Sequence, residues 1–453
     1  MKILRIISII LFAAIVITPL VFFNTESNSI STIDNRKLTE NPFKLKGDLT
    51  ANIQNYVNDR IGFRDEMITG YTILNDRLFG KMVHPSYTYG KDGYVFGSGL
   101  STSNGFSDYH VVFADMVAKI QTYCHERGVP FLFVFNPAKP AVYSDKIADG
   151  VNYNREWVEL FLGELDKRNV NYLDNTETLV QLKENGINGF NQKYDANHWN
   201  DVGAFYGTRA MLERLDQICD NIHVNEIDEF IVSETLQTSL QVSRFPIKES
   251  VPSISLKTSA TSLYEEYFSE LELHPSYQSF GYYVNESESV QDTPRALVFQ
   301  GSYMNSYGYK YLANAFKEYI HVHDYQNVLN FPYYFNVFQP ECVVFEVAEY
   351  TLADAYFSYE EMKNIDYNPT LLQQGEDRYQ EIGIAGKDVT VERGDKMTTV
   401  TFNTDQEYSY VWIELDQTYD MQRVEDGYRI TVETVRYEKA KDSIKIYGSL
   451  SSP

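Results

Sequence analysis

Two short, uninterrupted apolar runs constrain the fold of this chain more than any other feature. The first, VPFLFVFN, occupies residues 129–136, and the second, RALVFQGS, occupies residues 295–302. Strands that are buried on both faces of a parallel sheet have this composition, because neither face requires polar residues in alternation. Since helical patterns adjoin both runs, we expect βα units of a doubly wound parallel sheet, which makes this an α/β fold.

Amphipathic segments and further strand signals complete the expected α/β region. Apolar residues recur at helical spacing in four segments, and three other stretches have the composition of strands. Helices are predicted at residues 109–127, 156–168, 176–185 and 202–215, and strands at residues 170–175, 321–328 and 340–350.

The segment upstream of the α/β region has a different pattern. Residues 41–81 carry apolar side chains at helical spacing with an interruption at Gly62, which predicts two helices joined by a bend. Residues 88–99 place Asp92 and Gly93 between β-prone residues, and this is typical of a hairpin.

The pattern of apolar and polar residues changes again near the C-terminus. Beyond about residue 368, apolar and polar residues alternate between turn breakers, which predicts a small antiparallel β domain of the sandwich type. We therefore expect a membrane segment at residues 1–25, an α/β domain at 26–367 and the β domain at 368–453. Residues 232–261 are rich in Ser and Thr and yield no assignment.

The N-terminal segment predicts contact with a membrane. Lys2 and Arg5 precede an uncharged apolar run, so that residues 3–23 span about 30 Å as a helix, enough to cross a bilayer. No clear small-x-small cleavage site and no lipobox Cys follow, which favours an uncleaved signal anchor over a removed signal peptide. The expected location is a single-pass cell-membrane protein with its bulk extracytoplasmic; the alternative is secretion after cleavage.

Charge and cysteine content exclude several classes of function. The net charge of −24 argues against a nucleic-acid partner, whose phosphates require clustered Lys and Arg. Three Cys far apart in 453 residues match neither a disulfide framework nor a Cys-x-x-Cys metal site. His321 and His323 share one strand face beside Asp324, yet no other ligands accompany them, so we expect no metal and no cofactor.

Ser302 is the candidate nucleophile. It follows an apolar strand and precedes a helical segment, and ligands of open α/β folds bind at the carboxyl ends of such strands. The start of the following helix also offers backbone N–H groups to a developing oxyanion. The alternative is that Ser302 only caps the helix, as Ser often does.

The stretch YDANHWND at residues 194–201 offers the partners that a nucleophilic Ser needs. Asp195 stands three residues before His198, so it is suited to orient the imidazole that takes the serine proton. The same stretch also has the composition of a helix start, with Asn197 or Asp195 near the cap. Together, the two motifs predict Ser302 as nucleophile, His198 as base and Asp195 as the acid of a triad.

A succession of motifs resembles a known family. The chain is similar to the extracytoplasmic SGNH-hydrolase-like proteins of the alginate O-acetyltransferase and DHHW-motif group, in which the Asp/His motif precedes the Ser motif. The matching stretches are NDRIGFRD (58–65), GKDGYVF (90–96), FNPAKPAVYSD (135–145), DANHWNDVGA (195–204) and VFQGSYMNS (298–306).

The resemblance implies a flavodoxin-like sheet, a membrane anchor and acyl transfer to a cell-envelope polysaccharide, with an integral-membrane acyltransferase as the partner that supplies the acyl group. Carried over by motif, Ser302 matches the nucleophile, His198 the base and Asp195 the acid. The family's serine commonly follows Gly-Asp, whereas here it follows Gln300 and Gly301. The alternatives are a non-catalytic polysaccharide-binding or assembly protein with a degenerate site, and a secreted carbohydrate esterase. The C-terminal β domain resembles, in placement only, the carbohydrate-binding module of some members.

Four further residues are oxyanion or substrate candidates. Lys139 and Tyr143 follow a predicted strand and match residues typical of the family, although an ion pair and an aromatic lid on the sheet rim explain them as well. Asn327 could donate its amide to an oxyanion or simply occupy a turn. Trp199 could stack on a sugar ring or pack the helix onto the sheet.

Overall fold

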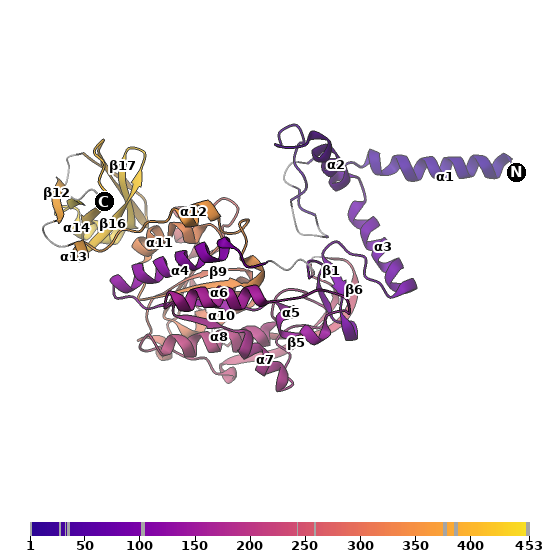
Figure 1. The fold of residues 1–453 in the computed structure, drawn as a ribbon, viewed down its shortest axis with the longest axis horizontal. Helices are drawn as coiled ribbons and strands as arrows, with labels where there is room; N and C mark the ends of the chain where they lie inside the picture. Colours follow the sequence, from indigo (N-terminus) through magenta and orange to yellow (C-terminus); the bar gives the residue numbers. More distant parts are fainter. Residues whose placement is uncertain are drawn as a thin grey trace.

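The chain begins with a long apolar helix that stands apart from the rest of the molecule (Figure 1). The computed structural model describes residues 2–26, 29–31, 33, 37–100, 105–241, 243–257, 260–374, 378–384 and 388–449. Helix α1 (Lys2–Val21) is apolar and long enough to cross a membrane, and its apolar side chains are exposed. A helix of this kind serves either as an anchor or as a signal peptide.

Two helices follow α1 and meet at a sharp corner. The predicted pair is confirmed as α2 (Leu49–Arg60) and α3 (Arg64–Phe79), and Gly62 lies between them. Gly62 is packed so closely against the end of α1 that a Cβ atom there would lie 2.6 Å from the Phe22 Cβ. The corner therefore accepts no side chain without displacing α1.

A mixed sheet of seven strands forms the centre of the molecule. Its strands occur in the order β4-β3-β11-β9-β10-β8-β7. They are β3 (Phe131–Asn136), β4 (Tyr172–Asp174), β7 (Thr261–Ser262), β8 (Phe280–Val284), β9 (Ala296–Gln300), β10 (Glu318–His323) and β11 (Cys342–Ala348).

The prediction of a parallel sheet is confirmed for five of these strands and wrong for the edge. Strands β4, β3, β11, β9 and β10 are parallel to one another, whereas β8 pairs antiparallel with β10, and β7 antiparallel with β8. Every residue of β3, β9 and β11 is buried, which explains their unbroken apolar composition. The antiparallel edge lies in a segment for which the sequence predicted no strand.

Helices pack against both faces of this sheet, with one hydrophobic core on each. The four helices predicted in this region are confirmed within a residue or two of their predicted ends, as α4, α6, α7 and α8. One face contacts α4 (Asp108–Glu126), α6 (Glu156–Lys167), α9 (Tyr264–Tyr267), α11 (Phe331–Phe338) and α12 (Tyr359–Lys363); the other contacts α5 (Lys139–Val142), α7 (Thr176–Glu184), α8 (Asp201–Asp216) and α10 (Tyr309–Ala315).

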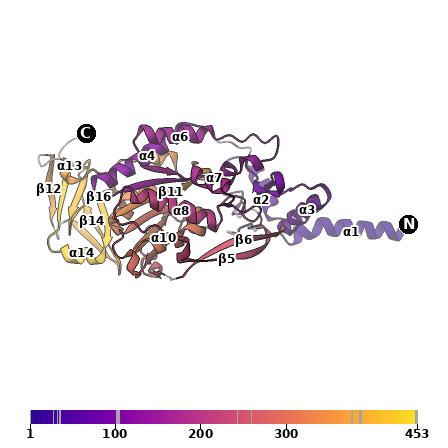
Figure 2. The ribbon, with the colours of Figure 1, turned by 90° about the horizontal axis from the view of Figure 1, so that it is seen from below.

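Two hairpins lie at the same end of the molecule as α3. The predicted hairpin is confirmed as β1 (Tyr87–Tyr89) and β2 (Val95–Gly97). The unassigned segment forms a long antiparallel pair, β5 (Phe230–Ser239) and β6 (Pro246–Leu256), which Figure 2 shows extending toward α3. Most of its side chains are at least partly exposed, so its sequence lacks the apolar run of a core strand.

The C-terminal part is an all-antiparallel sheet at the opposite end from α1 (Figure 1). Its strand order is β12-β18-β15-β16-β17-β14-β13, and it packs on α11 through β16 and β17. The elements are α13 (Leu371–Gln374), β12 (Tyr379–Ile384), β13 (Val389–Arg393), β14 (Met397–Asn403), β15 (Val411–Glu414), β16 (Thr418–Val424), β17 (Gly427–Glu433), α14 (Thr434–Ala440) and β18 (Lys445–Ser449). The division of the chain into domains at residues 25 and 367 stays a prediction.

Candidate active site

Ser302 lies at the carboxyl end of the central strand β9. Strand β9 is flanked by β11 and β10, and the chain turns at Gly301 into helical backbone that begins at Ser302 and continues through a π-helical turn into α10. Ser302 itself is partly exposed. The Ser302 side chain therefore lies at the start of a helical segment and is partly accessible to solvent.

Asp195, His198 and Ser302 form one chain of hydrogen-bonding distances. The Nε2 atom of His198 lies 2.9 Å from Ser302 Oγ, and its Nδ1 atom lies 3.0 Å from Asp195 Oδ2. Asp195 and Ser302 thus contact opposite edges of the same imidazole. This geometry lets Ser302 donate its proton to Nε2 while the Asp195 carboxylate accepts the proton on Nδ1.

Hydrogen bonds from backbone N–H groups to two carboxylates fix the loop that carries Asp195 and His198. Asp195 Oδ1 accepts hydrogen bonds from the backbone N–H groups of Asn197 and His198, both at 3.0 Å. The Glu249 carboxylate, on β6, accepts three more from the N–H groups of residues 192–194. The sequence predicted a helix start here with Asn197 or Asp195 near the cap; the N-cap of α8 is Asn200, whose Oδ1 accepts from the N–H groups of Val202 and Gly203.

Each member of the Asp195–His198 pair favours the charged form of the other. Burial of the imidazole opposes its protonation, but the charge and hydrogen bond of Asp195 outweigh burial and raise the pKa of His198. Burial likewise acts to raise the pKa of Asp195, while the charge and hydrogen bond of His198, together with the backbone N–H donors, outweigh it and lower that pKa. The pair is arranged to stabilise an imidazolium, the species formed when His198 takes the serine proton.

Tyr350 is a further residue at the site that sequence reasoning missed. Its hydroxyl lies 3.1 Å from Ser302 Oγ and 3.3 Å from His198 Nε2. Above all, burial raises the pKa of Tyr350, so its hydroxyl stays protonated and able to donate. Tyr350 follows β11, which pairs with β9. The signal that could have found it is its position two residues after a buried strand.

Lys139 lies near the triad without facing the solvent. It is fully buried, and its Nζ atom donates to the backbone carbonyls of Val95, Gln192 and Asp195 at 2.7, 3.1 and 3.2 Å. Burial lowers its pKa to about 7 against the opposing charges of Asp195 and Glu249. Lys139 is therefore not placed to contact a substrate. Its three hydrogen bonds instead hold strand β2 and the Asp195 loop together.

Tyr143 and Trp199 are both buried, at 1% exposure each. The Tyr143 hydroxyl donates to Asn188 Oδ1, and its ring packs among Tyr94 and Phe190. Trp199 Nε1 donates to the Tyr303 carbonyl at 3.0 Å. A sugar cannot stack on a buried ring, so the hypothesis that Trp199 contacts a sugar is not supported by its position; it supports the helix start beneath Ser302.

Asn327 has no free amide hydrogen for an oxyanion. Its Nδ2 atom donates to the carbonyls of Tyr277 and His323 at 2.9 and 2.8 Å, and its Oδ1 accepts from the His274 N–H and the Tyr334 hydroxyl. The side chain is 3% exposed. The structure thus places Asn327 in the turn role that the sequence also allowed.

A pair of buried acids lies beneath the serine turn. Glu346 accepts from the Gly301 N–H at 2.9 Å and from Asn136 Nδ2 at 2.7 Å; burial, with the charge of Asp324, raises its pKa to about 8. A Cβ atom on Gly301 would lie 3.4 Å from Asp324 Oδ1. The resemblance expects an Asp directly before the serine, at the position of Gly301. Here the carboxylate of Asp324, which follows strand β10, lies beside that position.

The described residues contain no cluster of three or more His, Cys, Asp or Glu side chains that could hold a metal ion. His321 is buried, and burial lowers its pKa to about 3, so it is a neutral imidazole.

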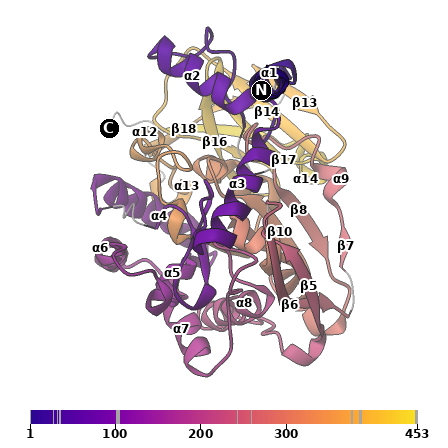
Figure 3. The same cartoon turned by 90° about the vertical axis from the view of Figure 1, so that its right-hand side faces the viewer.

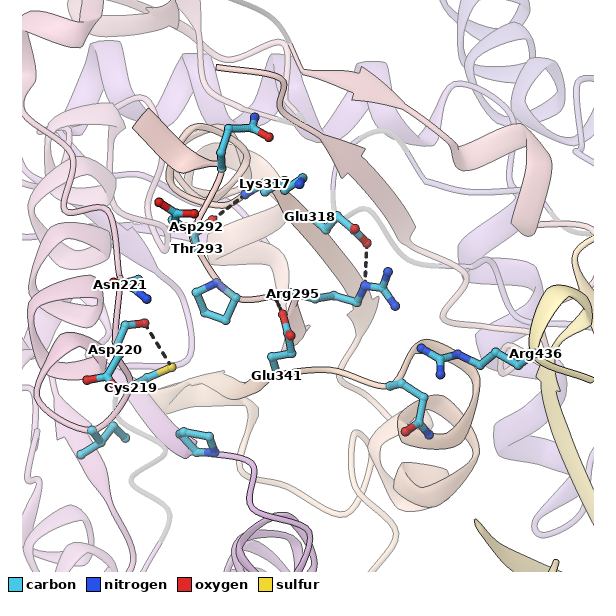
Figure 4. Close-up of a pocket in the computed structure, with 15 residues that line it drawn as sticks. Cys219, Asp220, Asn221, Asp292, Thr293, Arg295, Lys317, Glu318, Glu341 and Arg436 are labelled. Carbon is cyan, nitrogen blue, oxygen red and sulfur yellow. Dashed lines mark hydrogen bonds and ion pairs between the residues drawn. The ribbon is translucent and has the colours of Figure 1, made fainter. Parts of the chain in front are cut away.

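Two cavities lie at opposite ends of the central sheet. One, of about 730 Å³, is lined by Pro130, Arg295 and Glu341, which directly precede β3, β9 and β11, and by Arg436 from the C-terminal part (Figure 4). Its Arg295 is paired with Glu318, as the dashed line in Figure 4 shows. The other, of about 450 Å³, includes Tyr350 and Asn197 and therefore adjoins the triad.

Comparisons with known proteins give structural neighbours only. No protein-family model matches the sequence, and no curated protein matches it either. Solved structures to which the chain is similar include Bacillus cereus PatB1 (TM-score 0.44, 17% identity, 58% of this chain and 95% of that one). They also include the O-acetyltransferase domain of Pseudomonas putida AlgJ (TM-score 0.44, 15% identity, 62% of this chain and 99% of that one). A third is a DHHW family protein from Eubacterium siraeum (TM-score 0.45, 14% identity, 63% of this chain and 97% of that one).

Proposed function

We propose that this protein is an extracytoplasmic O-acyltransferase that acts through a Ser302–His198–Asp195 triad. The observation that carries the proposal is the continuous chain of contacts, 2.9 Å from Ser302 Oγ to His198 Nε2 and 3.0 Å from Nδ1 to Asp195. A serine, an imidazole and a buried carboxylate in this order suit covalent acyl transfer. The AlgJ domain named above is an O-acetyltransferase, and an acetyl group is the acyl group we propose here.

The reaction follows from the positions of the donors and acceptors. Ser302 Oγ attacks the carbonyl carbon of an acyl ester while His198 Nε2 takes the serine proton. Backbone N–H groups in the first helical turn, which lack intrahelical acceptors, hold the oxyanion, and Tyr350 donates to the oxygen of Ser302. Collapse of this intermediate expels the donor alcohol, which receives the proton from His198, and leaves an acyl-serine.

A second alcohol then resolves the acyl-serine. His198 removes the proton of a glycan hydroxyl as it attacks the acyl carbon, and returns that proton to Ser302 when the ester forms on the glycan. Water in place of the glycan hydroxyl would make the protein an esterase. These steps use only side chains and backbone of this chain, and the resemblance supplies the expectation of an integral-membrane partner that delivers the acyl group.

We further propose that α1 is retained as a membrane anchor. The end of α1 is part of the folded corner: the Gly62 N–H donates to the Pro19 carbonyl at 2.9 Å, and the Phe22 ring lies 5.1 Å from that of Phe63. The guanidinium of the buried Arg60 donates to the carbonyls of Asn24 and Glu26. Cleavage directly after the apolar run would remove Pro19 and Phe22 from the corner and leave Asn24, one of the acceptors of Arg60, at the new N-terminus. The mass of the mature protein, which shows at which residue its N-terminus lies, tests this proposal.

Turnover of an acetyl-ester reporter by the full chain in detergent tests the triad. Wild type is expected to hydrolyse the ester and to carry an acetyl group on Ser302 after a brief quench, whereas Ser302→Ala and His198→Ala are expected to lose both signals. Unchanged turnover in these variants would end the triad proposal. Absence of any acetyl-Ser302 adduct in wild type, together with wild-type glycan binding by an inert Ser302→Ala protein, would favour the non-catalytic binding protein, to which the Gln300–Gly301–Ser302 sequence also points.

A further inference from the structure

A cleft lies beside the proposed triad and is lined by residues that precede and follow several elements of the α/β region. It has a volume of about 450 Å³, enough for a sugar residue and part of its neighbour. The lining combines aromatic rings, glycine backbone and amide side chains. Its residues include Gly97, Tyr153, Asn154, Trp157, Asn197, Tyr350 and Tyr356.

Tyr350 connects this cleft to the reaction centre. The residue is 36% exposed in the cleft, while its hydroxyl contacts both Ser302 Oγ and His198 Nε2. A hydroxyl group on a ring bound in the cleft is therefore within reach of the atoms that would deprotonate and acylate it. This makes the cleft the place for the acceptor.

The aromatic side chains suit the faces of a sugar ring. Tyr153 and Tyr356 are partly exposed, and Trp157 is mostly buried with one edge toward the cleft lining. Burial and the nearby Glu349 charge raise the pKa of Tyr153, and its uncharged hydroxyl donates to Glu349 Oε1 at 3.5 Å, which leaves its oxygen as an acceptor. Rings with polar edges combine apolar stacking with hydrogen bonding, which is what sugar hydroxyls and C–H faces require.

No cationic side chain of the described residues lines the cleft: the lining contains no Lys, Arg or His. The one carboxylate in the lining, Glu349, is 4% exposed. It is already paired with Arg155 Nε at 3.0 Å and accepts from the Ala138 N–H at 3.0 Å.

Both the local charge and the whole chain oppose an acidic polymer. A polyuronate carries a carboxylate on each sugar, and binding it requires Arg or Lys side chains to replace the water that solvates those charges. The net charge of −24 adds long-range repulsion. An uncharged sugar meets neither penalty.

We propose that the acyl acceptor is an uncharged glycan, bound with one sugar ring between Tyr350, Tyr356 and Tyr153. The inference rests on the proposed acyl transfer for its chemistry, but the acceptor preference is a property of the cleft itself. It therefore predicts binding of neutral oligosaccharides even by a protein that cannot form the acyl-serine.

The test measures binding and transfer separately. Full-length Ser302→Ala protein in detergent is titrated with cellopentaose and chitopentaose as neutral probes and with pentagalacturonate as the anionic probe. At least one neutral probe is expected to bind about tenfold or more tightly than the uronate. Equal or tighter binding of the uronate, or no binding of either neutral probe, would overturn the proposal.

Wild-type protein loaded from an activated acetyl ester provides the transfer readout. Acetylation of the bound neutral probe, detected by mass spectrometry, supports the acceptor assignment, and acetylation of the uronate alone would overturn it. If wild type forms no acetyl-Ser302, the triad proposal fails, while the titration of Ser302→Ala still decides the acceptor class. The two failures are thus distinguishable.

A matched pair of substitutions tests the role of charge. Asn154→Lys places a cation in the cleft lining and is expected to strengthen uronate binding about two- to fivefold. Asn152→Lys adds the same charge on an exposed residue outside that lining and is expected to leave uronate binding at the wild-type level. An equal gain in both variants would show that net charge, not the cleft, controls the preference, and would contradict the proposal.

Discussion

Asp195→Asn tests the triad most directly, because Asn has almost the shape of Asp without its charge. The side-chain oxygen of the new Asn can still accept from the backbone N–H groups of Asn197 and His198, so the loop is expected to keep its conformation. Its amide nitrogen would face His198 Nδ1 in place of Asp195 Oδ2, now 3.0 Å away. Nδ1 then becomes the acceptor, and the ring proton moves to Nε2.

This change of tautomer disables the base. With a proton already on Nε2, His198 cannot take the proton of Ser302, whose Oγ lies 2.9 Å away. The expected fall in kcat is about 10³- to 10⁴-fold, or about 4 to 5.5 kcal/mol in activation free energy. Stopped-flow hydrolysis of 4-nitrophenyl acetate by the full chain in detergent measures it.

The pH profile gives a second readout of the same substitution. Because Asp195 raises the pKa of His198, wild-type kcat/KM is expected to fall on acidification with an inflection above the ordinary histidine value of about 6.5. Without the carboxylate, burial dominates and the inflection moves to lower pH. Asp216→Asn, on the exposed end of α8, removes a charge far from the contacts of His198 and serves as the control. A folded Asp195→Asn protein with kcat within tenfold of wild type and an unshifted inflection would refute the triad.

Three other substitutions have defined outcomes. Tyr350→Phe should lower kcat for the ester about ten- to hundredfold with little change in KM, because it removes only the hydroxyl that lies 3.1 Å from Ser302 Oγ and that we propose as a donor to it; an unchanged kcat would argue against this donor role. Lys139→Met should lower the free energy of unfolding by about 2–4 kcal/mol in urea melts, since three carbonyls lose their donor. Between about pH 7 and 10 the buried Lys139 has lost its proton while the unfolded chain still holds it, so the stability of the wild type should rise with pH. Lys139→Met should abolish this rise. Its persistence in the variant would contradict the assignment. Gly301→Asp should destabilise the fold by about 2–3 kcal/mol because it adds an acid beside Asp324, and adding Asp324→Ala should recover most of the loss; additive effects would refute this coupling.

The parallel core was predictable from sequence because its strands are buried on both faces. β3, β9 and β11 therefore appear as apolar runs without period. The β5–β6 hairpin was not predictable in this way, since most of its side chains are partly exposed and neither strand has a fully buried face. The length of that hairpin is a property of its backbone pairing, which composition does not record.

The same distinction applies to the site. Ser302 and the Asp195–His198 pair, which the structure brings into contact, were predicted as site candidates because each has the residue types and the position that its proposed chemistry requires. Tyr350 and Glu346 depend instead on β11 lying beside β9, a pairing that strand order along the chain does not disclose. Lys139 was misjudged because an ammonium is usually exposed, and only the three surrounding carbonyls explain its burial.

The corner at Gly62 sets the direction of α3 relative to α1. Helix α3 runs from this corner into the α/β region (Figure 3), where Ile73 packs with Ala196 of the Asp195 loop and Asp76 accepts from the Tyr89 hydroxyl. Its 16 residues measure about 24 Å, and in Figure 3, where α1 is seen end-on, α3 lies across the direction of α1. Under the proposal that α1 is a membrane anchor, the corner therefore turns α3 along the membrane surface rather than away from it.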